Sequence, residues 1–408
     1  MRLLYIYAAA FFIFVQPALA GQATGIPGPA EAPRLIELLG SEDGYIRSQA
    51  SYALIGMGHD ATPALIEALS AKKSLVEVIY VLNAVKDERA APALARLLDT
   101  DDEEVRRRAE SALFALGAPA TPFLIDALKD PLRSRSAARA LSLISLTKEN
   151  KKLYEILGNP DPSIRASAAS VLRSWRDPGA TGPMGALLKD PDAIVRTEAS
   201  GYFLALGPDA ETPYLDLLLA DTDENVRINA LKIVLKTRKS DYFAVYCGIL
   251  KNDTNAQARK LAAEALFRYD RDKSAPALME ALGDPEDLVA SEAADYLGEM
   301  KAREAAPALL KFFDTGAKKP SDKIVESAVR ALSNMDAQYD PELLLPYVNW
   351  ENLYVVKVVL VAWETSSMPE NAGIRAALAR YADMPVDNRY KERVRKLLER
   401  LKAPLESP

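Results

Sequence analysis

Residues 182–207 read GPMGALLKDPDAIVRTEASGYFLALG and contain one complete copy of the unit from which most of the chain is built. A short apolar segment ends before the turn Asp190-Pro191-Asp192, because proline lacks an N–H and clashes with the preceding helical turn. A second segment opens at Ile194 and stops at Gly207, whose tolerance of positive φ suits a helix C-terminus. The stretch therefore predicts a helical hairpin of about 30 residues.

Two sequence markers repeat with the length of this hairpin. Prolines suited to a first helical turn recur along the chain, and the second helix carries a hydrophobic residue followed by arginine. The prolines are Pro33, Pro63, Pro92, Pro122, Pro183, Pro213, Pro276 and Pro307. The arginines are Arg47, Arg106, Arg165, Arg196, Arg227 and Arg259. Because both markers share one period, we predict an array of about eleven hairpins from Ala32 to the region of Trp363.

Composition supports an all-α array. The 408 residues exceed the usual size of one compact domain, and no obvious linker divides them. Hydrophobic residues make up 49% of the chain and aromatic residues only 7%, which suits thin, closely packed helices better than a large sheet core. We therefore predict an α-solenoid, a superhelix of stacked short helical hairpins, over residues 32–365.

The N-terminus has the pattern of a signal peptide. An apolar run from Leu3 to Val15 is followed by Ala18-Leu19-Ala20, a small-x-small cleavage pattern, and is short for a bilayer span. We expect export to a periplasm or the cell exterior after cleavage of residues 1–20, and an uncleaved anchor is the alternative. Residues 21–31 form a Pro/Gly-rich leader, and no later segment resembles a membrane span.

Residues 366–408 are expected to form a C-terminal helical cap and tail. The stretch Asn388 to Lys402 is basic and carries an apolar stripe, so it can cover the last core face, or alternatively bind an acidic partner. Cys247 is the single cysteine, which rules out an intramolecular disulfide, and its apolar context favours a small buried hydrophobe. Stability must then come from packing between repeats.

The residue inventory argues against most chemistry. The formal net charge is −6, which gives no general attraction for nucleic acid. His59, the only histidine, sits in a turn, so neither a histidine metal cluster nor a His-containing triad can form within one chain. Asp99–Glu104 and Asp221–Glu224 lack the glycine and spacing of a calcium loop, and acidic residues at helix N-termini are favourable in any case. No catalytic, cofactor-binding or metal-binding residue is predicted.

The hairpin length and the turn D-P-D-x-x-V-R-x-x-A resemble the short HEAT-like repeats first named for phycobilisome lyases. The clearest copies are residues 91–117, 182–207 and 212–235. The resemblance implies a scaffold or adaptor and, less often, an enzyme. Related hydroxylases use repeated His-Glu pairs that this sequence lacks, and a lyase role would need a cytoplasmic bilin-binding partner, which the signal peptide argues against.

In this family a turn aspartate and a helix arginine typically form a stacked ladder. The resemblance implies such a ladder here, with the aspartate also capping the second helix and the arginine reaching carboxylates of its own or an adjacent repeat. The ladder residues are Asp190, Arg196, Asp221, Arg227, Asp253 and Arg259. The pattern decays where Asn159 precedes Arg165 and where Ala290 replaces the arginine. We interpret the ladder as structural.

Function is therefore expected on a surface. Second helices commonly line the concave side of a solenoid, and helical phase selects side chains between their core positions. The candidate partner surface is Arg107, Arg108, Tyr202, Asn229, Lys232, Lys260, Glu264, Arg268 and Tyr296. We expect an exported, non-enzymatic scaffold that binds a protein partner. Alternatives are a platform subunit of an enzyme complex and a binder of envelope polymers, for which the three tryptophans are too scattered to form a track.

Two places where the copies differ are further candidates for function. The second repeat has Lys72-Lys73-Ser74 in place of the Asp-Pro turn, and the tenth carries the longer turn Gly316–Pro320. Insertions at turns cost a solenoid little, because a turn contacts few other repeats. The sequence does not predict the oligomeric state.

Overall fold

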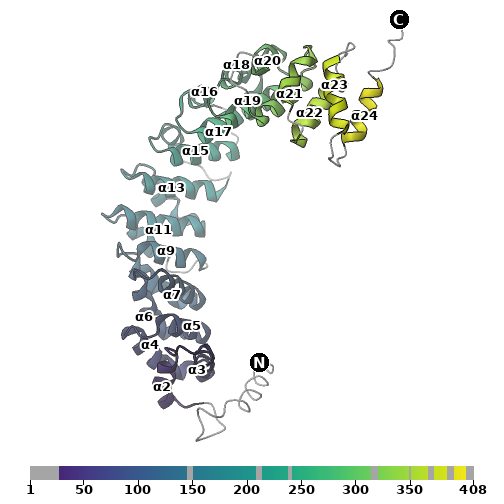
Figure 1. The fold of residues 1–408 in the computed structure, drawn as a ribbon. Helices are drawn as coiled ribbons and strands as arrows, with labels where there is room; N and C mark the ends of the chain where they lie inside the picture. Colours follow the sequence, from purple (N-terminus) through teal and green to yellow (C-terminus); the bar gives the residue numbers. More distant parts are fainter. Residues whose placement is uncertain are drawn as a thin grey trace. The chain divides into compact units, whose positions relative to one another are not determined.

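The computed structural model describes residues 27–144, 150–207, 214–237, 241–313, 320–348, 351–365, 372–383 and 390–400 (Figure 1). All regular elements within these ranges are helices, which confirms the predicted all-α solenoid class. The predicted signal peptide, most of the leader and residues 316–319 of the long turn lie outside the described residues. The chain forms two compact units, Met1–Leu206 and Gly207–Pro408, called unit 1 and unit 2 below.

The described residues of unit 1 form six helical hairpins. Their first helices are α2 (Ala32–Leu38), α4 (Thr62–Ser70), α6 (Ala91–Arg96), α8 (Thr121–Ala127), α10 (Asn150–Ile156) and α12 (Thr181–Leu187). Their second helices are α3 (Gly44–Met57), α5 (Leu75–Val85), α7 (Glu103–Leu116), α9 (Ser134–Leu143), α11 (Pro162–Trp175) and α13 (Ala193–Leu206). Short 3-10 helices precede or extend several of them: η1 (Pro29–Glu31), η2 (Gly58–Ala61), η3 (Glu88–Ala90), η4 (Leu97–Asp99), η5 (Ala118–Ala120) and η6 (Pro178–Ala180).

Unit 2 continues the same pattern. Its first helices are α14 (Leu215–Leu219), α16 (Phe243–Asn252), α18 (Arg271–Ala281), α20 (Ala306–Leu310) and the 3-10 helix η9 (Pro341–Tyr347), with η7 (Arg303–Ala305) and η8 (Lys311–Phe313) flanking α20. Its second helices are α15 (Glu224–Thr237), α17 (Ala256–Tyr269), α19 (Asp287–Met300), α21 (Asp322–Asn334) and α22 (Leu353–Thr365). A last pair follows, α23 (Ala372–Asp383) and α24 (Tyr390–Arg400), and α24 contacts α22 as well as α23.

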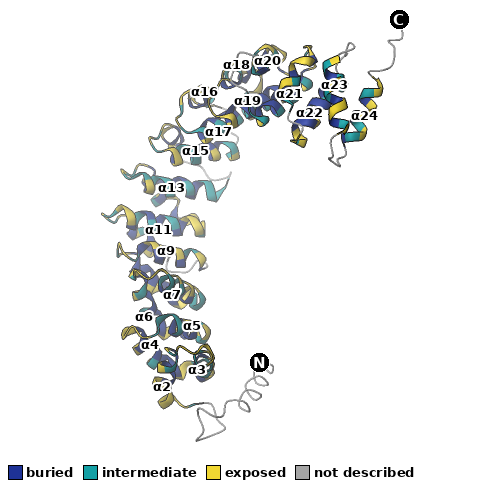
Figure 2. Ribbon diagram, in the orientation of Figure 1, coloured by how far each residue is buried: buried dark blue, intermediate teal, exposed yellow. Residues whose placement is uncertain are grey.

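The hairpins stack into two layers within each unit. In unit 1, α2, α4, α6 and α8 contact one another in sequence, and so do α3, α5, α7, α9, α11 and α13. In unit 2 the second helices α15, α17, α19, α21 and α22 form the corresponding layer. Leucines such as Leu54, Leu82 and Leu113 are fully buried between the layers, and alanines allow the close approach of the helices. Figure 2 shows many exposed residues at the turns and helix ends and buried residues within the helices.

Five of the eight predicted prolines open a first helix. Proline stands at the first or second position of α2, α4, α6, α8 and α20. Pro276 departs from the prediction, because α18 begins five residues earlier at Arg271 and contains the proline in its interior. Arg271, the first residue of α18, donates through Nη2 to the Glu299 carbonyl at 2.6 Å. Pro213 lies outside the described residues.

Six of the second helices end at a residue with positive φ. Gly58, Gly117 and Gly207 have φ of +58°, +69° and +102° at the ends of α3, α7 and α13. At the ends of α5, α11 and α19, non-glycine residues take the left-handed conformation instead: Lys86, Arg176 and Lys301. Left-handed backbone costs a residue with a Cβ about 1 kcal/mol or more. The stops without glycine are therefore strained.

Candidate interaction surface

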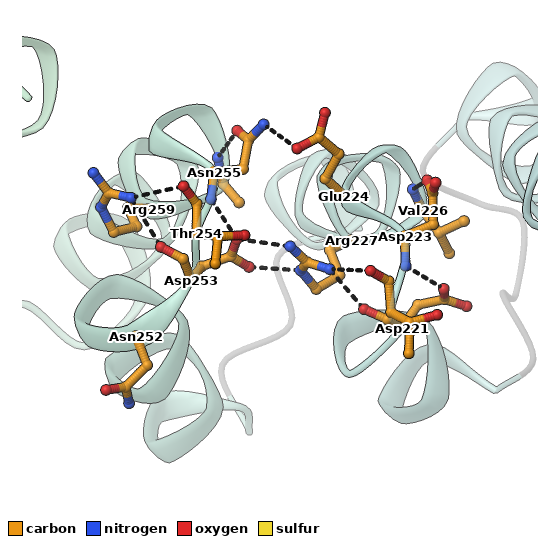
Figure 3. A network of polar contacts seen from close by, with 12 residues as sticks. Asp221, Asp223, Glu224, Val226, Arg227, Asn252, Asp253, Thr254, Asn255 and Arg259 are labelled. Carbon is orange, nitrogen blue, oxygen red and sulfur yellow. Dashed lines mark hydrogen bonds and ion pairs between the residues drawn. The ribbon is translucent and has the colours of Figure 1, made fainter.

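A recurring arrangement, called the clasp below, joins successive repeats: an arginine of a second helix binds a carbonyl of its own turn and the aspartate carboxylate of the next turn. Arg227 of α15 points back to its own turn, where Nη1 donates to the Asp221 carbonyl at 2.7 Å and to the Thr222 carbonyl at 3.1 Å (Figure 3). Its Nε and Nη2 atoms donate to the two carboxylate oxygens of Asp253, in the next turn, at 2.6 and 2.7 Å. One guanidinium thus ties two repeats together through a bidentate pair.

The same clasp recurs at two other places. Arg165 binds Asp190 at 2.7 and 2.8 Å, and Arg259 binds Asp284 at 2.7 Å through both nitrogens. These side chains are largely removed from solvent. The Asp–Arg pairs therefore join neighbouring repeats, whereas within one repeat the arginine uses the backbone carbonyl of the turn aspartate. Arg196 likewise donates to the Asp190 carbonyl at 2.9 Å.

This geometry explains why the sequence pattern can decay without loss of the clasp. Asn159 replaces the turn aspartate before Arg165, but the arginine needs only the Asn159 carbonyl, 2.8 Å from Nη1, and the carboxylate of the next repeat. Burial by itself would raise the pKa of Asp253, but hydrogen bonds from Arg227 and from the Asn255 N–H hold that pKa below its usual value. The carboxylate is thus ionised at neutral pH.

The cap of the second helix is not the residue that the family resemblance implied. Asp190 accepts the Asp192 N–H at 2.9 Å, whereas Asp192 accepts the N–H groups of Ile194 and Val195 at 2.8 and 3.2 Å. The prediction that the first turn aspartate caps the helix is therefore wrong. The second acid of the turn caps it, because a cap must stand directly before the first helical residue.

The acidic side chains of the turns accept hydrogen bonds from, or form ion pairs with, the helices that follow them. Asp102 accepts the Glu104 and Val105 N–H groups at 2.9 and 3.1 Å, and Glu104 binds Arg107 and Arg108 at 2.7 and 2.6 Å. Asp223 caps α15 in the same way. Within the described ranges, no group of three or more His, Cys, Asp or Glu residues is arranged to hold a metal ion.

The lone histidine and cysteine have ordinary surroundings. His59 is exposed in η2, and its Nδ1 lies 3.8 Å from Oδ2 of the buried Asp87. Hydrogen bonds from the Arg89 side chain hold the pKa of Asp87 well below its usual range. Cys247 is half-buried in α16, and burial raises the pKa of its thiol.

Seven of the nine predicted surface residues reach solvent. They are Arg107, Arg108, Asn229, Lys232, Lys260, Glu264 and Arg268. Several of them form ion pairs on the protein itself: Lys260 lies 3.4 Å from Glu292 of the next second helix, and Arg268 pairs with Glu264 one turn before it. The prediction from helical phase thus places these seven on the solvent side but says nothing of their pairing.

Tyr202 and Tyr296 are not surface residues, and their selection is corrected here. Tyr202 is fully buried, and its hydroxyl donates to the Asp177 carbonyl at 2.6 Å beside η6. Tyr296 is 9% exposed, stacks on Phe267 with ring centroids 4.5 Å apart, and donates to Glu292 at 3.0 Å. Each tyrosine stands one residue away from the partly exposed positions of its helix. Burial of its large apolar ring against the neighbouring helices is favourable at that position.

The sequence matches a protein-family model over three ranges. A model described as HEAT repeats matches residues 32–113, 150–236 and 244–333, together more than half of the chain. The chain belongs to the HEAT-repeat family. No curated protein matches it. Among the described helices, none combines the length and hydropathy that a bilayer crossing requires.

Solved structures of other proteins are similar to this chain at low sequence identity. The Escherichia coli protein YibA is 18% identical over 62% of this chain and 96% of its own, with a TM-score of 0.48. Human deoxyhypusine hydroxylase is 20% identical over 77% of this chain and 95% of its own, with a TM-score of 0.27. Kap95p, solved with RanGDP, is 12% identical over 98% of this chain and 65% of its own, with a TM-score of 0.46. Because these scores are below 0.5, the neighbours' activities do not transfer to this chain.

The HEAT repeats of unit 1 expose aromatic residues that the sequence analysis did not select. Tyr52 of α3, Tyr80 of α5 and Phe114 of α7 are 55%, 48% and 44% exposed. A signal was available, because Tyr52 and Tyr80 each stand six residues before the residue that ends their helix, Gly58 and Lys86. An alignment of the copies on their helix ends would have found them.

Proposed function

We propose that this HEAT-repeat protein is an exported, non-enzymatic scaffold that binds a protein partner on the solvent face of its second helices. The observation that carries the proposal is the two-layer packing: each second helix contacts its neighbours along two sides and presents a third side to solvent, repeat after repeat. Such a face can grow with the number of repeats into an extended binding surface.

The composition of this face supports a protein partner. It carries arginine on α7 and α9 and exposed aromatic residues on α3, α5 and α7, and arginine and tyrosine are frequent anchors at protein interfaces. The acidic overall charge argues against nucleic acid as the ligand. Export rests on the sequence of residues 1–20 alone, and N-terminal sequencing of the mature protein should find Gly21 first.

The proposal is tested by affinity purification of the full protein from the exported fraction of its source, with quantitative mass spectrometry. We expect one protein in stoichiometric amount, lost when exposed residues of the second helices are replaced and retained when first-helix residues are replaced. Recovery of a bound small molecule or metal with no protein partner would contradict the scaffold function.

A further inference from the structure

Exposed aromatic side chains follow a row across the first three second helices of unit 1. Tyr52 and Tyr80 occupy equivalent positions in α3 and α5, and the equivalent residue of α7 is Ser111, with Phe114 three residues later on the same side. Because α3 contacts α5 and α5 contacts α7, the row crosses three repeats. Each ring can lose considerable apolar area to a ligand.

Arginines extend the row onto the next helix. α9 contacts α7, contains no acidic residue, and exposes Arg135 and Arg139, which are four residues apart on one side. Arg139 binds Glu110 of α7, with Nε 3.1 Å from Oε2. Arg135 has no carboxylate partner among the described residues. This end of the row therefore offers a guanidinium to an incoming carboxylate.

The corresponding face of α15, α17, α19 and α21 in unit 2 is different. Several of its charged side chains are paired with one another, as in Lys260 with Glu292 and Arg330 with Glu326. No aromatic side chain of α15, α17, α19 or α21 is exposed, and all residues of these four helices are described. A ligand on that face would have to displace existing ion pairs and would gain little apolar contact.

Resting on the proposed scaffold function, we propose that Tyr52, Tyr80, Phe114, Arg135 and Arg139, the aromatic–arginine row, bind a partner segment that carries Asp or Glu beside aromatic or large aliphatic residues. The aromatic side chains would contact its apolar residues on α3, α5 and α7. Arg135 of α9 would bind one of its carboxylates, because guanidinium and carboxylate pair in a bidentate geometry. Arg139 lies beside it and is already paired with Glu110.

Peptide selection tests this inference. The full-length protein is immobilised, a random-peptide phage library is selected on it, and the affinities of enriched peptides are measured by fluorescence anisotropy. We expect the peptides to combine acidic and aromatic residues. The triple variant Tyr80→Ser/Phe114→Ser/Arg135→Glu should weaken their binding by about tenfold or more, since buried aromatic and arginine anchors dominate interface energetics.

A matched control comes from the first-helix layer. Phe123 of α8 is 39% exposed, a fraction similar to that of Phe114. Arg96 of α6 resembles Arg135, because it is exposed and has no carboxylate partner among the described residues. The variant Phe123→Ser/Arg96→Glu should leave peptide affinity unchanged within about twofold. Circular dichroism melts should show both variants folded, because every replaced side chain is exposed.

Several outcomes would overturn the inference. Enrichment of basic peptides, or equal affinities of the triple variant and the wild type, would contradict it. If the unit 2 variant Lys232→Glu/Arg268→Glu lost affinity for the selected peptides and the triple variant of unit 1 did not, binding at the aromatic–arginine row would be refuted. The scaffold function would remain intact. Binding of phosphatidylglycerol vesicles that the triple variant abolishes, with no peptide enriched, would assign the row to lipid and count against the scaffold function as well.

Discussion

At the scale of single residues, the clasp shows what a period can and cannot predict. The recurrence of aspartate and arginine favoured a structural role for Arg227 and Asp253, because catalytic groups normally occur once per site. Which carboxylate each arginine would bind was not fixed by the sequence, since Asp221 and Asp253 flank Arg227 in adjacent repeats. The choice is made by the stacking of the hairpins, which brings Asp253 to the guanidinium.

Replacing the arginine of one clasp should destabilise the array. Arg227→Ala leaves the buried Asp253 carboxylate without its bidentate partner, at a cost of about 3 kcal/mol or more. Arg227→Lys should recover only part of this, because an ammonium cannot reproduce the planar fork. Urea unfolding followed by circular dichroism measures the shift, with the exposed Lys232→Ala as control. Equal midpoints for Arg227→Ala and Lys232→Ala would refute the role of the clasp.

The clasp should also make stability depend on acid. The pKa of Asp253 is lowered in the folded protein, so its stabilising contribution is present above the unfolded pKa of about 3.9 and is lost as pH falls through the folded value. We therefore expect the stability difference between wild type and Arg227→Ala to be full at neutral pH and to shrink below about pH 4. Urea midpoints over that range measure it. A difference that stays constant or grows on acidification would contradict the assignment.

At the scale of helices, the sequence predicted the hairpins better than the directions of their side chains. Proline and glycine act on the local backbone, so helix starts and stops were readable at Pro63 and Gly207. Pro276 was misplaced because α18 is already helical from Arg271, whereas α4, α6, α8 and α20 are preceded by a separate 3-10 turn. Tyr202 was misplaced because one residue is about 100° of helical rotation, which separates a buried position from an exposed one.

Glycine should relieve the strained end of α5. Lys86 has φ of +55°, so Lys86→Gly should stabilise the protein by about 0.5–1 kcal/mol. Ala84→Gly, an exposed position two residues earlier in the same helix, should instead destabilise it, because glycine gains backbone freedom in the unfolded chain. Thermal melts compare the two. A lower melting temperature for Lys86→Gly than for wild type would show that the lysine conformation carries no strain.

A methyl group at Gly298 should push two second helices apart. A Cβ there would lie 2.6 Å from the Ala331 Cα, where α19 meets α21, so Gly298→Ala should cost about 1–3 kcal/mol. Gly248 of α16 has nothing within 4 Å of such a Cβ, so Gly248→Ala should be neutral or stabilising. Calorimetry of both variants distinguishes them. Similar melting temperatures would mean that α19 and α21 can separate without cost.

At the scale of the whole molecule, the repeat period was sufficient to predict the architecture. Each hairpin buries its apolar faces against its neighbours, so a repeated pattern of Ala and Leu implies a stack. The division into unit 1 and unit 2 was not foreseen, since no linker composition marks the boundary at Leu206 and Gly207. The exposed row of unit 1 was missed for a related reason: Tyr52 and Tyr80 are unusual only when copies are compared position by position.

Hydrogen–deuterium exchange of the full protein, with and without a selected acidic peptide, tests the central claim most directly. Binding to the solvent face of the second helices predicts slower amide exchange in α5 and α7, residues 75–85 and 103–116, with the first helices α4, α6 and α8 unchanged. Protection confined to those first helices, or protection of the second helices of unit 2 alone, would contradict binding at the aromatic–arginine row. Protection of α4, α6 and α8 would also contradict the assignment of function to the second-helix layer.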